Sequence, residues 1–443
     1  MISIFSKIPV VIVFFISITP IYPLARWFFP HIKNKNTAAL LHFLYGVLVC
    51  IILFDYDTIY AVMMGIVSYY LTKYFSTAIP IIEAACFMYF THILIYIRGD
   101  DWALDITCIT MIMFQKIVAF AFNFKDGKTI QASKDKTSGR ARWDTVAIFE
   151  MPSLLCYLSY LFTPYGSFSG PFFEYKLFEV ILNRGNRKPE EITEADHKLG
   201  FTRFIGCFGW AFSTYALLLF YSYETYQSEW YLKLPLLLRM LMLNLLTMFS
   251  SIRYFPAWWH AEAGIFEFGI GSAGIVPLDE LTNLSLYDVA TSTTVDEFIR
   301  RWNHTTHIFW KNYLFTRLLH AGVNKVIASY AVFILSMVWH GLKFIYLGML
   351  PETFIVNFAD QLLHKLLPIT QTSPKWITWF HIWWTDFTMF YTTSTWYFPH
   401  FNEYLYVRST VYFLPTVISI IIIIVLNIFP PKRRSKEINQ KTE

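Results

Sequence analysis

The chain alternates between long apolar runs and short polar stretches. Ten apolar runs can be traced, at residues 8–24, 39–54, 58–72, 78–97, 104–123, 204–221, 234–250, 326–350, 377–399 and 405–429. About 20 apolar residues are needed for a helix to cross the hydrocarbon core of a bilayer. A segment in lipid must also pair its backbone groups internally, and the two-residue alternation of a membrane barrel is absent. The pattern therefore predicts an all-α, polytopic membrane protein of about 10–11 transmembrane helices.

Two further stretches are apolar but rich in glycine and proline. Residues 151–175 contain Pro152, Pro164, Gly166, Gly170 and Pro171, and residues 256–277 have a similar composition. Irregular backbone at membrane depth survives only where protein buries it or where it lines a cavity. We therefore expect re-entrant or broken helices around a central catalytic chamber, with simple kinked helices as the alternative.

Composition supports a membrane protein and excludes several other classes. Of 443 residues, 55% are hydrophobic, 19% are aromatic and only 15% are charged. A soluble domain carries nearer 25% charged residues, and this composition is unlike that of disordered, collagen-like or disulfide-rich chains. The formal net charge of +5 is small, and no basic face indicates a nucleic-acid partner.

Local charge predicts how the chain is oriented. The segment 125–143 carries six basic residues against two acidic ones, which is typical of a cytosolic loop. The basic run Lys432-Arg433-Arg434 follows the last apolar run. We therefore expect one polytopic domain over residues 1–430, followed by a basic cytosolic tail at 431–443.

His340 is the most informative ionisable residue. It lies in the apolar run 326–345, and an ionisable group inside a membrane segment is a functional candidate by default. Burial disfavours the imidazolium ion, so a neutral base is expected near pH 7. The alternative is a histidine that only holds the helices together by hydrogen bonding.

The segment 294–317 forms a second group of polar and aromatic residues. At helical spacing it predicts an amphipathic helix at the membrane interface, with Asn303 at its middle. His304 and His307 alone are too weak a signal for zinc, and the five cysteines show no metal-ligand spacing, so no metal site is expected. Asn303-His304-Thr305 is also a glycosylation sequon, as is Asn283-Leu284-Ser285. A glycan on Asn303 and a role inside a chamber exclude each other.

Five stretches, in order along the chain, resemble the membrane-bound O-acyltransferase family. SMVWHGLKFIYLG (336–348) resembles its WHG motif, and FIRRWNHTTHIFW (298–310) resembles its WN motif. Residues 104–127, 151–178 and 253–271 are similar to its lysophospholipid acyltransferase branch. Tyr287-Asp288 and WITWFHIWWTDFTMFYTT (376–393) are most similar to lysophosphatidylinositol acyltransferases. The chain departs from many relatives after WHG, where Phe344-Ile345-Tyr346 replaces Pro-Gly-Tyr.

The resemblance implies acyl transfer from acyl-CoA to the free hydroxyl of a lysophospholipid in the endoplasmic reticulum membrane. It makes His340 the general base and Asn303 a polar group that stabilises the oxyanion or orients a reacting group. Such a base contributes typically ~10²–10⁴-fold, and one donor to the oxyanion ~10²–10³-fold. No permanently bound cofactor is implied, because acyl-CoA is a co-substrate. Further substrate-binding residues are implied at Trp302, Trp339, Gly341, Gly170, Pro171 and Tyr175.

Two alternatives stay open at this point. The acceptor could be a sterol, a diacylglycerol or a peptide. The chain could instead be a proton-coupled transporter with His340 as a relay, although it lacks the internal repeats common in transporters. Acyl-chain preference, head group and oligomeric state are not determined by the sequence.

Overall fold

The computed structural model describes residues 10–99, 104–135, 137, 140–218, 223–341, 345–398 and 400–430. All regular elements among these residues are helices, which confirms the all-α prediction. The described residues group into two compact units that interleave along the chain. Because the chain passes between the units repeatedly, the single domain over 1–430 stays a prediction. The predicted tail at 431–443 lies outside the described residues.

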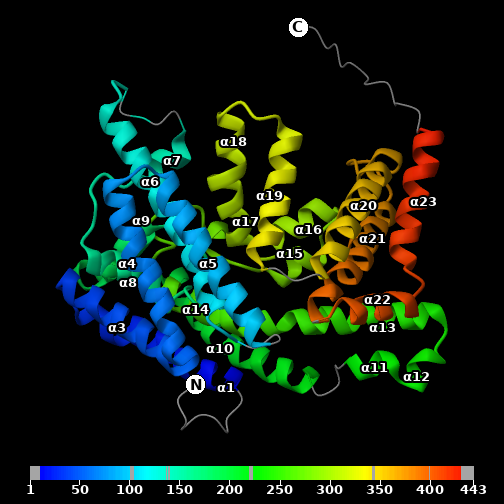
Figure 1. The fold of residues 1–443 in the computed structure, drawn as a ribbon, viewed down its shortest axis with the longest axis horizontal. Coiled ribbons are helices and arrows are strands. Elements are labelled where there is room, and N and C mark those ends of the chain that lie inside the picture. Colours follow the sequence, from blue (N-terminus) through cyan, green and yellow to red (C-terminus); the bar gives the residue numbers. More distant parts are fainter. Residues whose placement is uncertain are drawn as a thin grey trace. The chain divides into compact units, whose positions relative to one another are not determined.

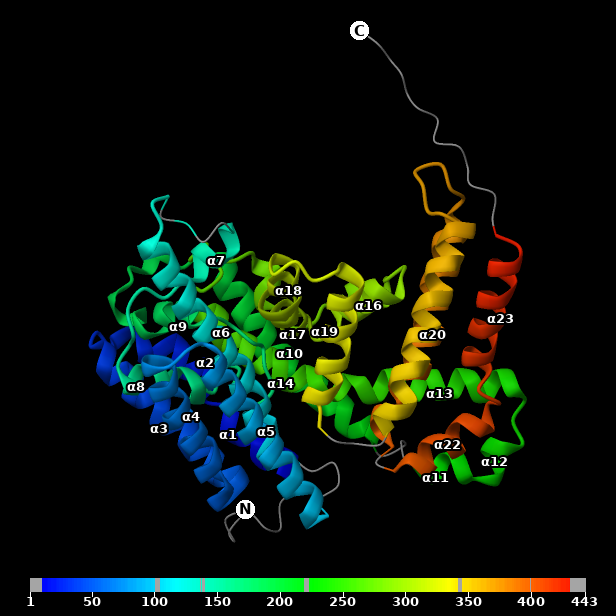
Figure 2. The ribbon, with the colours of Figure 1, turned by 45° about the horizontal axis from the view of Figure 1, so that its top comes forward.

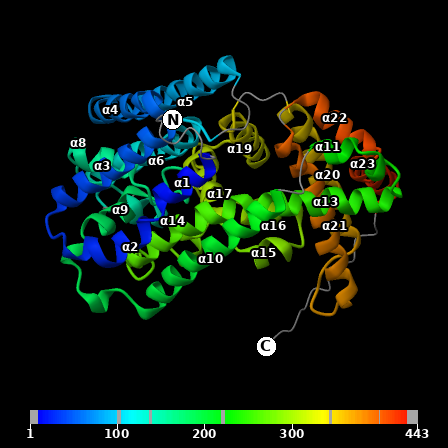
Figure 3. The same cartoon turned by 90° about the horizontal axis from the view of Figure 1, so that it is seen from below.

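The first unit comprises described residues within 1–220, 249–285 and 300–343. Its helices are α1 (Val10–Ile18), α2 (Ile21–Pro23), α3 (Lys35–Phe54), α4 (Thr58–Tyr74), α5 (Ala78–Arg98), α6 (Thr107–Ala132), α7 (Ala141–Val146), α8 (Leu154–Phe162), α9 (Tyr175–Leu182), α10 (Glu194–Leu218), α14 (Phe255–Glu267), α17 (His304–Trp310), α18 (Thr316–His320) and α19 (Lys325–Trp339). Helices α4, α5 and α6 pack side by side (Figure 1). Helices α10 and α14 run along one another (Figure 3).

Side-chain caps explain where several of these helices begin. The Asn34 side chain accepts hydrogen bonds from two backbone N–H groups at the start of α3. Ser153 caps α8 in the same way, and Asn324 caps α19. Such caps satisfy backbone donors that have no partner inside the helix. At the other end, α5 stops at Gly99, which takes the left-handed conformation common after helices.

Five helical segments are long and apolar enough to cross a membrane. They are residues 12–31, 35–74, 78–98, 107–132 and 236–267, and the pair α22–α23, bent by 73°, would make a sixth. This number, which concerns the described residues, is smaller than the 10–11 expected from the apolar runs. Two of those runs share the segment 35–74, and the run at 326–350 divides into α19 and α20, with α19 too short to count as a full span.

The two glycine- and proline-rich stretches differ in their secondary structure. Residues 163–174 form a buried, irregular segment after α8, as expected. The stretch 256–277, by contrast, begins as the regular helix α14, and only its second part is irregular. The helix tolerates Pro256 because this residue lies in the first turn, where its missing N–H would have no partner within the helix.

The segment 294–317 is not the continuous interfacial helix that its amphipathic pattern predicts. α16 (Val295–Arg301) ends before Asn303, which has a left-handed backbone (φ 48°, ψ 52°), and α17 begins directly after it. A π-helical turn, η9 (Lys311–Phe315), then leads to α18. The pattern fails here because Phe298, Phe309 and Tyr313 are buried in protein rather than placed in lipid.

The second unit comprises described residues within 221–248, 286–299 and 344–443. Its helices are α11 (Tyr223–Gln227), α12 (Glu229–Leu232), most of α13 (Leu236–Ser251), α15 (Leu286–Ala290), most of α16, α20 (Ile345–Leu366), α21 (Lys375–Thr393), α22 (Phe401–Thr410) and α23 (Leu414–Ile428). Helices α20 and α23 pack side by side (Figure 2), and α21 contacts both.

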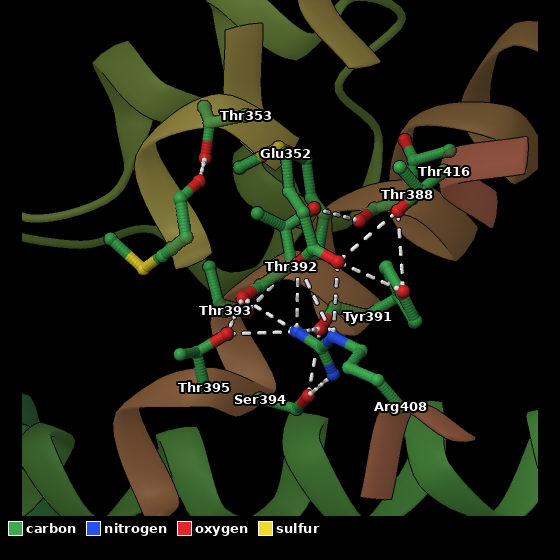
Figure 4. Close-up of polar contacts among 12 residues, drawn as sticks. Glu352, Thr353, Thr388, Tyr391, Thr392, Thr393, Ser394, Thr395, Arg408 and Thr416 are labelled. Carbon is green, nitrogen blue, oxygen red and sulfur yellow. Dashed lines mark hydrogen bonds and ion pairs between the residues drawn. The ribbon is translucent and has the colours of Figure 1, made fainter. Parts of the chain in front are cut away.

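A buried ion pair joins the helices of the second unit (Figure 4). Arg408 on α22 is 0% exposed and lies 3.2 Å from the Glu352 carboxylate on α20. Its guanidinium also donates to the carbonyl of Tyr391 at the end of α21 and to the hydroxyls of Ser394 and Thr395. These bonds satisfy a charge that would be costly to bury alone.

Candidate active site

Asn303 occupies a turn that few residue types adopt readily. Its positive φ costs roughly 1–2 kcal/mol for most residues, and asparagine is among the residues that tolerate it best. The turn separates the end of α16 from the start of α17. The side-chain oxygen Oδ1 of Asn303 is buried and has no hydrogen-bond partner among the described residues. A buried acceptor of this kind is available to a ligand that carries a donor.

Asn283 holds the start of α17 in place. Its backbone carbonyl accepts from His304 N–H at 2.8 Å, and its side-chain Oδ1 accepts from Thr305 N–H at 3.2 Å. The Thr305 hydroxyl donates to the same Oδ1 atom. Asn283 N–H in turn donates to Glu262 on α14, whose carboxylate pairs with Arg203 on α10. The turn at Asn303 is therefore anchored to the α10–α14 pair.

The loop containing Gly170 and Pro171 packs against this anchor. Phe172 N–H donates to the Thr305 hydroxyl at 2.9 Å. Gly170 has φ 90°, and a Cβ atom there would lie 2.9 Å from the Asn283 amide nitrogen. Glycine is therefore required twice, for the backbone conformation and for the close approach. The structure thus brings Gly170, Pro171 and Asn303 to the same network.

Trp302 lies on the other side of the turn among aromatic rings. Its ring packs edge-to-face with Trp258 and Tyr254, at centroid distances of 5.8 and 6.2 Å. The Trp258 indole N–H donates to the carbonyl of Ser169, directly before Gly170. Trp302 is thus connected through Trp258 to the same glycine–proline loop.

His340 follows the last residue of α19, on a turn that its neighbours fix. The Trp339 indole is buried, donates to the carbonyl of Met111 on α6 at 2.9 Å, and packs 4.7 Å from the His340 ring. Gly341 has φ 105°, and a Cβ atom there would lie 2.8 Å from Nδ1 of His92 on α5. A second imidazole thus lies directly against the residue after His340, while His340 itself is only half-buried.

One aromatic cluster connects the two parts of the site. It includes Phe172, Phe309, Trp310, Tyr313 and Trp339. Trp310, at the end of α17, packs edge-to-face with Trp339 at 6.4 Å. Asn303 precedes the same helix, and seven residues of α-helix correspond to about 10 Å along its axis. The Asn303 turn and the Trp339-His340 turn are therefore fixed at opposite ends of one short helix.

Tyr175 belongs elsewhere in the first unit. It is buried in the larger hydrophobic core, where its ring packs against Phe120, Tyr160 and Phe178. The structure therefore does not group it with the other predicted substrate-binding residues, although it follows the irregular segment 163–174. That segment is held from α6 by Lys116, which is fully buried and donates to the Tyr160 carbonyl and the Ser167 hydroxyl, both at 2.8 Å.

Several supporting residues were not identified from the sequence. Glu262 and Lys116 carried a signal, since each is a charged residue inside an apolar stretch. Asn283 was noted only as a glycosylation sequon, and its 0% exposed side chain is inaccessible to a glycan in the folded chain. Thr305, the third residue of the other sequon, is also buried. His92 carried no pattern that would connect it with Gly341.

The fold and the site together define a polytopic membrane protein that holds polar side chains inside a helical, aromatic-rich core. Comparisons with known proteins identify its family. Residues 66–397 match the membrane-bound O-acyltransferase family. This match covers more than half of the chain, and the chain therefore belongs to that family and is an O-acyltransferase.

Curated relatives agree with this assignment. The chain is 24% identical over 461 aligned residues to membrane-bound glycerophospholipid O-acyltransferase 2 of Gallus gallus, covering 93% of this chain and 83% of that protein. It is 22% identical to lysophospholipid acyltransferase 5 of Drosophila melanogaster, with 81% and 71% covered. The lysophospholipid acyltransferase of Saccharomyces cerevisiae is 24% identical, but the alignment covers 54% of this chain and 42% of that protein.

Proposed function

We propose that this protein transfers a fatty acyl group from acyl-CoA to the free hydroxyl of a lysophospholipid, with lysophosphatidylinositol as the favoured acceptor. The names of the relatives support a lysophospholipid acceptor. The inositol preference rests on the sequence resemblance at Tyr287-Asp288 and at residues 376–393. The proposal needs no permanently bound cofactor.

His340 acts as the general base in this proposal. It takes the proton of the acceptor hydroxyl while the oxygen attacks the thioester carbonyl carbon. The carbon–sulfur bond then breaks, and the proton passes from the imidazolium to the leaving thiolate of coenzyme A. The observation that carries the proposal is the fixed Trp339-His340 turn, which shares one aromatic cluster with α17 and the Gly170 loop.

Asn303 supplies the second polar group. Its buried Oδ1 atom is available as an acceptor, and its amide N–H groups are donors. It can therefore stabilise the oxyanion or orient the acceptor hydroxyl, whereas the His340 turn lies at the other end of α17. An Asn303→Asp variant keeps the acceptor oxygen and replaces the donor amide group with a second, negatively charged acceptor. Loss of kcat with an unchanged KM for the acceptor would favour the oxyanion role.

The test is an activity matrix on purified full-length protein in lipid nanodiscs, with lysophospholipids of different head groups offered against a series of acyl-CoAs. His340→Ala should lower kcat by ~10²–10⁴-fold if the base is lost. His320→Ala is the matched control, because His320 ends α18 and is exposed. Near-normal acyl transfer by folded His340→Ala protein would exclude His340 as the general base. Activity on a sterol, diacylglycerol or peptide, but on no lysophospholipid, would show that the proposed acceptor class is wrong.

We also propose that the protein resides in the endoplasmic reticulum membrane, with its C-terminal tail in the cytosol. The family match supports a multi-pass membrane protein. A cytosolic tail is consistent with the basic run Lys432-Arg433-Arg434. Protease protection of a C-terminal epitope in sealed microsomes tests the orientation, because a cytosolic tail is digested without detergent.

A further inference from the structure

Three metal-ligating side chains converge in the second unit. Asp360 and His364 lie one turn apart near the end of α20, and His381 lies on α21. One ligand atom from each residue lies within 4.8 Å of the other two. The expectation that the protein has no metal site considered only the cysteines and the His304–His307 pair. The new group joins two helices that the sequence does not show to be neighbours at these positions.

Backbone carbonyls engage one nitrogen of each imidazole. Nε2 of His364 lies 2.8 Å from the Thr293 carbonyl, and Nε2 of His381 lies 2.8 Å from the Leu367 carbonyl. A carbonyl can only accept, so each Nε2 carries the proton and each neutral ring keeps a lone pair on Nδ1. Histidines that bind metals are commonly held in this way through their second nitrogen.

The remaining polar atoms include two that are buried without a hydrogen bond. Nδ1 of His381 has no hydrogen-bond partner among the described residues, and Oδ1 of Asp360 accepts no hydrogen bond but lies 3.9 Å from Nε2 of His364. The other Asp360 oxygen accepts from Val295 N–H at 3.1 Å. Asp360 and His381 are buried, whereas His364 is half-buried and leaves a route from the surface. Leaving a buried acceptor unpaired is costly, so these atoms favour a bound cation or donor.

From this geometry we propose that Asp360, His364 and His381 bind one divalent transition-metal ion, with Zn²⁺ as the best match. Two imidazoles and one carboxylate form a donor set that zinc sites use, with water as the fourth ligand. Mg²⁺ and Ca²⁺ prefer oxygen ligands throughout. Metal–ligand bonds of ~2.0–2.2 Å place ligand atoms roughly 3.3 Å apart, so the present 4.8 Å spread must contract modestly.

Binding also requires a change in ring orientation. The His364 and His381 rings are stacked, with centroids 3.7 Å apart and planes at 16°. Nε2 of His364 lies 3.9 Å from Oδ1 of Asp360, so this ring must turn to present Nδ1 instead, and the two stacked rings must also tilt apart. The ion would then fasten the end of α20 to α21. The Asp360 carboxylate holds Val295 N–H and the His364 imidazole holds the Thr293 carbonyl, so the start of α16 would be fastened as well.

The experiment measures metal binding and does not depend on acyl transfer. Full-length protein with a tag free of histidine is stripped with a chelator in detergent and then titrated with Zn²⁺ alone. Retained zinc is counted by mass spectrometry, and thermal unfolding is followed with and without Zn²⁺. Mg²⁺ serves as the control ion. We expect one retained Zn²⁺ per chain and a higher unfolding temperature with Zn²⁺ than with Mg²⁺.

His381→Gln is the decisive variant. The glutamine amide can still donate to the Leu367 carbonyl but offers no Nδ1 lone pair, and affinity for Zn²⁺ should fall by more than the ~10–100-fold that loss of a group supporting a ligand costs. Should this variant not fold, His364→Gln replaces it at a half-exposed position. His304→Gln is the control, because it disrupts the other close histidine pair. No retained Zn²⁺ in wild-type protein, or equal affinity in wild type and His381→Gln, would overturn the proposal.

Discussion

The most direct test of how the site is assembled is removal of the Thr305 hydroxyl. This hydroxyl accepts from Phe172 N–H at 2.9 Å and donates to Oδ1 of Asn283, so it connects the glycine–proline loop to the start of α17. Thr305→Val has nearly the same shape and lacks only the hydrogen-bonding group. Thr305 is 1% exposed, so water cannot easily take the place of the hydroxyl.

The size of the effect follows from what is left unpaired. Phe172 N–H loses its partner completely, which costs ~1–3 kcal/mol for a buried donor. Asn283 Oδ1 keeps the hydrogen bond from Thr305 N–H, so losing the second bond, from the hydroxyl, costs only ~0.5–1.5 kcal/mol. The two costs add to about 1.5–4.5 kcal/mol. If all of this appears in the transition state, kcat/KM falls by roughly 10-fold to 2,000-fold.

The assay compares Thr305→Val with two matched variants in acyl transfer and thermal unfolding. Thr305→Ser keeps the hydroxyl, and Thr306→Val removes a neighbouring hydroxyl that accepts from the Gln115 amide at 3.3 Å. Both should retain most of the activity. Thr305→Ser keeps the glycosylation sequon at Asn303, whereas Thr305→Val removes it. The wild-type protein must therefore first be shown to carry no glycan there, by unchanged mobility after glycosidase treatment. Equal kcat/KM and equal unfolding temperature for Thr305→Val and Thr305→Ser would refute the reasoning.

Substitutions at Gly341 and Arg408 have predictable effects on activity and stability. Gly341→Ala introduces a positive-φ strain of ~1–3 kcal/mol and a Cβ atom 2.8 Å from His92 Nδ1. Activity should fall strongly, and adding His92→Ala should restore part of it; no restoration would contradict the close contact. Arg408→Met leaves the buried Glu352 carboxylate without its countercharge and should destabilise the protein by ~3–5 kcal/mol. The double variant Arg408→Met/Glu352→Gln should lose less stability than Arg408→Met alone, as measured by thermal unfolding, and an equal loss would argue against the ion pair.

The helical membrane class could be predicted because it depends on local composition. An apolar run that must satisfy its own backbone has few choices, and the run at 78–97 matches α5 to within one residue, although α6 extends nine residues beyond the run at 104–123. The number of spans could not be predicted in the same way. Whether a run is one span, two helices or part of a broken pair depends on neighbours that are distant in sequence, as at the α19–α20 break.

Candidate residues for the site could be named from the sequence, and their roles stay predictions, but the groups that support them could not be named. His340 could be singled out because an imidazole is rare in an apolar run, and Trp339 because of the resemblance to the WHG motif. The groups that hold the Asn303 turn, Asn283 and Glu262, come from other parts of the chain. Their role depends on three-dimensional hydrogen bonds that leave no local pattern. Amphipathic spacing also misplaced the turn, since it predicts faces of a helix but not a left-handed residue that interrupts it.

The left-handed backbone of Asn303 allows its two contributions to be separated. Asn303→Gly keeps the conformation at no steric cost and removes the amide, whereas Asn303→Ala removes the amide and adds backbone strain of roughly 1–2 kcal/mol. If the amide takes part in chemistry, both variants lose acyl transfer to the same extent, and only Asn303→Ala loses stability as well. If the residue serves only to turn the chain, Asn303→Gly stays active. Measuring kcat and unfolding temperature for both variants therefore decides whether Asn303 is a reacting group or a turn, because the two roles predict opposite results for glycine.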